Sequence, residues 1–133
     1  MADGDVQDDR SILDEDVLWR RVRPTEVAFD PELGRKRPKT QAFQNHPGTD
    51  AMSLTLAREI GNSIEAALEG HADSLIVALP AKVFRANGQK LVPVPGEVAG
   101  HVHVIGRKPK SVQNQFVKRA QWIVAPPDVN SPD

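Results

Sequence analysis

Residues 74–79 place the tightest constraint on how this chain can fold. Five consecutive apolar side chains follow Ser74, and the run ends at Pro80. An uninterrupted apolar run of strand length is typical of a strand buried in the interior of a sheet. Pro80 suits the first turn of a helix, which we expect to stop at Asn87-Gly88. The sequence therefore predicts a buried central strand with a helix directly after it.

Two short segments near the start of the chain also have strand character. Residues 17–23 end at Pro24 and fit either a strand or the last turns of a helix. We favour the strand, because Leu18 and Val22 fit the alternation of a strand and would lie on the same face. Pro24 then begins the next turn. Residues 26–29 are expected to add a second short strand.

Residues 90–94 and 101–105 predict two more strands, joined through a turn at Pro95-Gly96. Pro93 places the first of these at a sheet edge, because proline cannot donate a hydrogen bond to a neighbouring strand. Residues 52–60 fit either a strand or a helix.

Two helices complete the expected fold. Residues 63–70 begin at Ser63, a good N-cap, and end at Gly70. Residues 111–122 carry apolar side chains at four-residue spacing, namely Val112, Phe116 and Ala120. The sequence predicts an α+β fold, with a small mixed sheet of four or five strands and two or three packed helices.

The length of 133 residues fits one domain. We expect an acidic disordered N-terminal segment at 1–13, a single α+β domain at 14–125 and a disordered, proline-rich tail at 126–133. Residues 30–48 are rich in proline, glycine and basic residues and predict a long loop.

The composition excludes several classes of function. The chain has no cysteine, which removes disulfides, zinc–thiolate sites and thiol catalysis and is compatible with a reducing cytosol. No apolar run is long enough to span a bilayer, and the N-terminus is acidic where a signal peptide is basic. We therefore expect a cytoplasmic protein with no membrane partner. The six aromatic residues (two Trp and four Phe) offer little for stacking nucleic-acid bases.

The near-neutral net charge of −1 hides an uneven distribution. Residues 1–16 hold seven acidic residues and one basic residue, whereas residues 17–133 hold 16 basic and 11 acidic residues. The basic residues concentrate at 20–23, 35–39 and 107–119. This pattern indicates an anionic partner, an acidic tail that shields a basic face, or simply solvated charges.

His101 and His103 are separated by one residue in a predicted strand, so their side chains share one face. Two imidazoles can bind one metal ion, but a stable site needs a third protein ligand, and no spacing in the sequence supplies it. We therefore predict no metal and no cofactor.

The segment from His101 to Arg107 resembles part of the strand motif of the histidine-triad nucleotide hydrolases and transferases. The resemblance implies a nucleophilic role for His101, with His103 as its neighbour. It is partial, because Ala99 stands where that family has its first histidine.

Arg20 and Arg21 are candidate ligand-binding residues. Adjacent strand residues face opposite sides, so one of the two is expected to point inward. Near the sheet histidines, a buried arginine would form an anion pocket suited to phosphate. The alternative is one arginine in solvent and one in a structural ion pair with Glu26 or Asp30.

A wider resemblance covers residues 17–126. It is carried by the segments 18–21, 37–43, 52–57, 100–108 and 120–126. These segments look like those of a group of small bacterial proteins that has no assigned function. The resemblance implies which positions to test first: Arg20, Arg21, Phe43, Ser53, His103, Lys108 and Trp122.

From these observations we expect a small cytoplasmic binding or accessory module that recognises an anionic ligand or an unknown protein partner. The expected ligand-binding residues are Arg20, Arg21, Ser53, Arg107 and Lys108. The alternative is a small enzyme that acts on a nucleotide or phosphoester, with His101 or His103 as the catalytic residue. The sequence disfavours a nucleic-acid partner, because it has no known nucleic-acid-binding motif and few aromatic residues.

Overall fold

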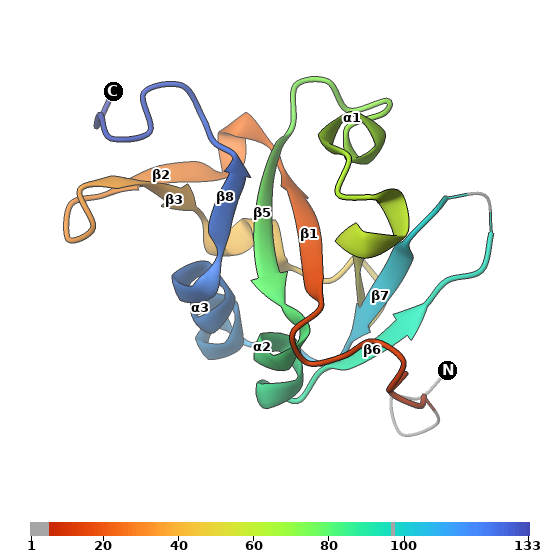
Figure 1. Cartoon of the computed structure of the whole chain (residues 1–133). Helices are drawn as coiled ribbons and strands as arrows, with labels where there is room; N and C mark the ends of the chain where they lie inside the picture. Colours follow the sequence, from red (N-terminus) through yellow and green to blue (C-terminus); the bar gives the residue numbers. More distant parts are fainter. Residues whose placement is uncertain (1–5, 97) are drawn as a thin grey trace.

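The computed structural model describes residues 6–96 and 98–133, and these form an α+β domain (Figure 1). Six strands build one sheet in the order β6-β7-β4-β1-β5-β8, and every neighbouring pair is antiparallel. The strands of this sheet are β1 (Val17–Val22), β4 (Ala51–Leu56), β5 (Leu75–Pro80), β6 (Lys90–Pro93), β7 (His101–Ile105) and β8 (Gln121–Val124). A separate hairpin consists of β2 (Val27–Asp30) and β3 (Arg35–Pro38).

Short helices connect and cover these strands. The α-helices are α1 (Ile64–Ala67), α2 (Ala81–Ala86) and α3 (Lys110–Arg119), and 3₁₀ helices lie at Pro24–Glu26, Thr40–Phe43 and Ala57–Ile60. As the sequence predicts, the side chain of Ser63 caps α1 by accepting a hydrogen bond from the backbone N–H of Ala66.

The α+β class is confirmed, but the expected sheet of four or five mixed strands is wrong in its strand count and in its strand directions. The sheet gains β8, because α3 ends at Arg119 and Ala120 takes an extended conformation. Trp122 then pairs with Val77 of β5 rather than continuing the helix. The basic segment 30–48 contains β3, whose backbone pairs with β2 although its side chains carry no strand pattern.

The larger core lies on one face of the sheet. Phe84 of α2 and Phe116 of α3 are fully buried there, with ring centroids 5.0 Å apart, and Phe43 packs edge-on against Phe116. The sheet contributes alternate residues to this face, including Leu18, Val22, Leu75, Val77, Leu79, Val102 and Val104.

The opposite face is covered in part by α1 and by the 3₁₀ helix at 57–60. Trp19, Ile76 and Ala78 are buried there against Ala57 and Ala67. Cross-strand register places Thr55 opposite both Trp19 and His101, and Ser53 opposite His103, so these side chains share this second face.

Residues 6–16 pack against α2 and β6, which differs from the disorder expected for 1–13; residues 1–5 lie outside the described residues. The backbone N–H of Asp9 donates to the carbonyl of Leu91, and the carboxylate of Asp8 accepts the N–H of Leu91. Ile12, 1% exposed, inserts into the larger core. This burial anchors a segment that is otherwise acidic.

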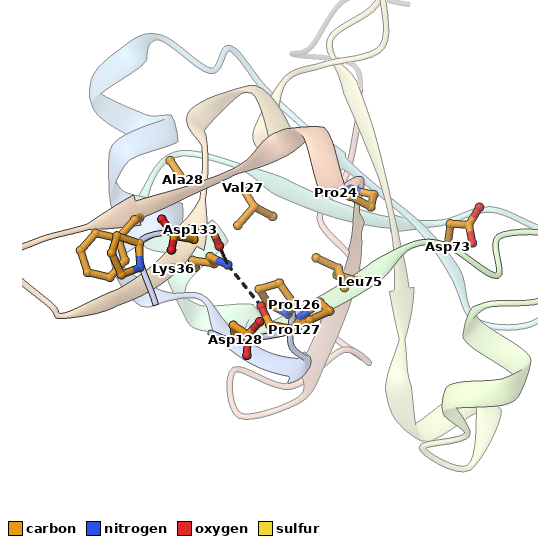
Figure 2. A pocket seen from close by; sticks show the side chains of 12 residues that line it. Pro24, Val27, Ala28, Lys36, Asp73, Leu75, Pro126, Pro127, Asp128 and Asp133 are labelled. Carbon is orange, nitrogen blue, oxygen red and sulfur yellow. Dashed lines mark hydrogen bonds between the residues drawn. The ribbon is translucent and has the colours of Figure 1, made fainter. Parts of the chain in front are cut away.

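The expected tail 126–133 also lies against the fold, beside the β2–β3 hairpin. The backbone N–H of Lys36 donates to the carbonyl of Val129 at 2.7 Å. A groove of about 790 Å³ lies between β2 and this tail (Figure 2). Among the described residues, no helix combines the length and apolar character needed to cross a membrane.

Candidate anion-binding cleft

The candidate site lies where β1 and β4 separate. The two strands are in register only at Leu18–Leu56 and Trp19–Thr55 within the described residues, whereas β1 stays paired with β5 as far as Val22. The side chain of Arg20 fills the resulting gap. Its Nε donates to the carbonyl of Ala42 and its Nη1 to the carbonyl of Ser53, each at 2.8 Å. One guanidinium group thereby satisfies two backbone carbonyls, one of them on β4 where β1 no longer pairs with it.

A cleft of about 620 Å³ opens beside Arg20, between the end of β1, the start of β4 and the loop that follows residue 43. Its cationic and imidazole side chains are Arg20, Arg21, Arg23, His46 and His71. Amides and hydroxyls also line it, from Gln41, Gln44, Asn45, Ser53 and Ser74. Glu26 is the one carboxylate among the described lining residues, so the cleft is strongly electropositive.

The arginines of the cleft lack the carboxylate partners that Arg37 and Arg85 have. Arg37 pairs with Asp30 at 2.9 Å, and Arg85 pairs with two carboxylates of the N-terminal segment. Within residues 6–96 and 98–133, no ion pair involves Arg20, Arg21 or Arg23.

The alternative of a structural ion pair with Glu26 or Asp30 is therefore not what the geometry shows. Asp30 is engaged by Arg37, and Glu26 accepts the backbone N–H of Arg23 at 2.9 Å.

The pKa of Arg20 is lowered from its usual value to about 10. Burial is the main cause; the charge of Glu26 opposes the shift, and the charges of Arg21 and Arg23 add to it. Burial also lowers the pKa of Arg21. Both guanidinium groups remain charged near pH 7, and Glu26 is the one carboxylate that faces them in the described lining. An anion in the cleft would balance the remaining positive charge.

The histidine pair lies next to this cleft without lining it. His101 and His103 are half-buried on the second face of the sheet, with ring centroids 5.0 Å apart. The Nε2 atom of His101 is 3.1 Å from the Oγ atom of Ser53, which does line the cleft. Burial lowers the pKa of His101, and the charges of His103 and Arg21 lower it further.

The four histidines of the chain thus lie in or beside the cleft. His46 and His71 line the cleft, while His101 contacts Ser53 and His103 lies opposite Ser53 across the strands. Within the described part of the chain, no three metal-binding side chains come together.

Lys108 and Arg107 lie outside the cleft lining. Lys108 is buried; its Nζ donates to the carbonyls of Val104 and Gly106, and to the side chain of Asn45. Arg107 is exposed, and its carbonyl accepts the side chain of Gln89. Through these contacts Lys108 has a structural role, because it fixes the turn after β7 and the cleft residue Asn45.

Of the residues that the sequence singles out, the structure thus brings Arg20, Arg21 and Ser53 into one cleft, with His101 and His103 beside it. The sequence pattern does not assign Arg23, His46 and His71 to the site. They come from three separate connecting segments, and no spacing in the sequence links them.

The groove of Figure 2 is larger than the cleft but differs in chemistry. Pro24, Val27, Leu75, Pro126 and Pro127 give it a mostly apolar lining. Its lysine, Lys36, already donates to the carbonyls of Pro127 and Asp133. Nothing there resembles the group of uncompensated cations in the cleft.

Comparison of the chain with protein-family models, with curated proteins and with solved structures found no match.

Proposed function

We propose that this protein is a small cytoplasmic binding module whose cleft takes an anionic ligand. The observation that carries the proposal is Arg20, a partly buried guanidinium that faces a polar cleft and has no ion pair among the described residues. Arg21 and Arg23 add two further cations to the same cleft. Charge-assisted hydrogen bonds from guanidinium groups are the strongest polar contacts available for binding an oxyanion.

The test is calorimetric titration of the protein with inorganic phosphate. Arg21 and Arg23 are exposed, so the double variant Arg21→Gln, Arg23→Gln should fold like the parent. Its affinity for phosphate should fall by about tenfold or more, because two charge-assisted contacts are lost. Arg119→Gln is the matched control, since Arg119 is exposed on α3 and belongs to a different pocket. Equal affinity of all three proteins, or no binding to any, would refute the proposal.

A second function, the transfer or hydrolysis of a phosphoester, is favoured by the contact between Ser53 and His101. A neutral imidazole within hydrogen-bond distance can accept the proton of the serine hydroxyl as its oxygen bonds to phosphorus and the ester P–O bond breaks. The proton then passes to the departing alcohol, and water or a second alcohol takes the phosphoryl group from the serine. Arg21, whose charge acts on His101, would stabilise the negative charge that develops.

Hydrolysis of p-nitrophenyl phosphate tests this second function. Activity that is lost in both Ser53→Ala and His101→Gln would support it, and activity unchanged in either variant would reject it.

A further inference from the structure

We propose that the ligand is a small, hydroxyl-rich molecule with one phosphoryl group, of the class to which sugar phosphates belong. This inference rests on the proposed function, since it names the chemistry of the anion that the same cleft binds.

The number of cations favours a phosphoryl group over a single carboxylate. One guanidinium fork is enough to match a carboxylate, which has two oxygens. The cleft instead offers the guanidinium groups of Arg20, Arg21 and Arg23, with the imidazoles of His46 and His71 in the same wall. A phosphate monoester, with three terminal oxygens and up to two negative charges, uses such a set more fully.

The existing hydrogen bonds leave donors for this role. Arg20 uses Nε and Nη1 for backbone carbonyls, and Arg21 uses Nη1 for the carbonyl of Ala67 at 3.2 Å. These contacts hold the two side chains in place, and the Nη2 groups have no bond of this kind among the described residues. A guanidinium fixed in this way loses less conformational freedom on binding than a free surface arginine.

The other residues that line the cleft indicate the chemistry of the rest of the ligand. Gln41, Gln44 and Ser74 provide amides and a hydroxyl, which can both donate to and accept from ligand hydroxyl groups. The described lining contains no phenylalanine or tryptophan, so a purine or pyrimidine ring would find no phenyl or indole ring to stack on. The cleft volume of about 620 Å³ lies in the range of small-molecule sites and is far more than a phosphate ion alone needs.

Calorimetric titrations with five probes test the inference: ribose 5-phosphate, inorganic phosphate, ribose, adenosine 5′-monophosphate and citrate. Ribose 5-phosphate should bind about tenfold more tightly than inorganic phosphate, and ribose should not bind. Adenosine 5′-monophosphate should bind no more tightly than ribose 5-phosphate.

One variant distinguishes binding of the phosphoryl group from binding of the rest of the ligand. Gln44→Ala should weaken ribose 5-phosphate by about three- to tenfold, the loss expected for one neutral hydrogen bond, and leave inorganic phosphate unchanged. Gln115→Ala, an exposed glutamine on α3, is the matched control and should change neither.

The outcomes also separate this inference from the proposed function. If citrate binds most tightly, or adenosine 5′-monophosphate exceeds ribose 5-phosphate by about tenfold, the ligand class is wrong while anion binding stands. The same holds if inorganic phosphate binds as tightly as ribose 5-phosphate. If no anion binds, both proposals fail.

Discussion

At the scale of single residues, Arg20 is at once a structural and a ligand-facing group. Its guanidinium has no ion pair with the described residues but donates to two backbone carbonyls where β1 and β4 separate. The hydrogen bonds explain how the fold holds it, and the missing carboxylate explains why we assign it a ligand.

Arg20→Met should lower the free energy of unfolding by about 2 kcal/mol, because two carbonyls lose their donor in a partly buried place. Arg23→Gln, at an exposed position of the same cleft, should change it by less than about 0.5 kcal/mol. Urea denaturation measures both. If Arg20→Met left the free energy of unfolding unchanged, the hydrogen bonds from Arg20 to the carbonyls of Ala42 and Ser53 would not contribute to stability.

His101 predicts a pH dependence of stability. Burial, His103 and Arg21 together lower its pKa in the folded state below the usual 6.5, so the unfolded chain binds a proton more readily. The neutral form contributes stability that is fully present above the unfolded pKa and is lost as pH falls through the folded one. Below about pH 6.5 the free energy of unfolding should therefore fall less steeply in His101→Gln than in the parent. Parallel pH profiles would argue that His101 titrates alike in both states.

The candidate site could be predicted only in part at this scale. The strand pattern of residues 17–23 correctly put Arg20 and Arg21 on opposite faces. The sequence could not show that both reach one cleft, because that depends on β1 and β4 parting beyond Trp19. His46 and His71 lie in connections, where side-chain position follows from tertiary structure rather than from a local period.

At the scale of elements, the turn after β7 is held by Lys108. Lys108→Met should lower the free energy of unfolding by about 2 kcal/mol, because the carbonyls of Val104 and Gly106 lose a charged donor. We expect the folded variant to bind inorganic phosphate within about threefold of the parent, because the lysine does not line the cleft and Asn45 keeps its hydrogen bond to the carbonyl of Gly106. Unfolding and calorimetry on the same samples separate the two effects. A large loss of affinity in a stable variant would return Lys108 to the ligand-binding set.

Composition alone does not predict the structure of the N-terminal segment, residues 6–16. Its acidic residues predict disorder, yet Asp8 and Asp14 pair with Arg85, whose guanidinium also donates to the carbonyls of Asp9 and Ile12. Ile12 adds apolar burial to these contacts. A charge-dense segment is ordered here because its partners lie far along the chain, which a local pattern does not reveal.

Arg85→Met should release this segment. We expect the free energy of unfolding to fall by about 2–3 kcal/mol, because several charge-assisted hydrogen bonds are lost together. Amide hydrogen exchange should become faster at Asp9 and Leu91, because their N–H groups donate the hydrogen bonds between the segment and β6. Arg119→Gln is again the control. Unchanged exchange at these amides would mean that Ile12 and the hydrogen bonds with Leu91 hold the segment without Arg85.

The elements that the sequence does not predict depend on neighbours in the same way. Arg35–Pro38 has no alternation and forms β3 only because β2 lies beside it. Ala120 and Ile123 extend the apolar spacing of α3, but the edge of β5 offers backbone partners to residues 121–124, and these form β8 instead. By contrast, β5, β7 and α2 were predicted because burial and capping signals lie within each segment.

At the scale of the whole molecule, the fold distributes charged side chains unevenly, which the net charge does not reveal. Asp8, Asp14 and Asp16 are paired with Arg85 and Arg58, whereas the three arginines of the cleft make no ion pair among the described residues. A chain with a net charge of −1 can thus present a strongly positive cleft.

The most direct test of this account is a titration of the ¹⁵N-labelled protein with inorganic phosphate, followed by amide chemical shifts. If the cleft binds phosphate, saturable shifts should occur at the amides of residues 20–23, 44–46, 53 and 71–74, which surround the cleft. Amides of α3 near Arg119 should not move. Shifts that spread evenly over exposed lysines and arginines, or none at millimolar phosphate, would contradict it.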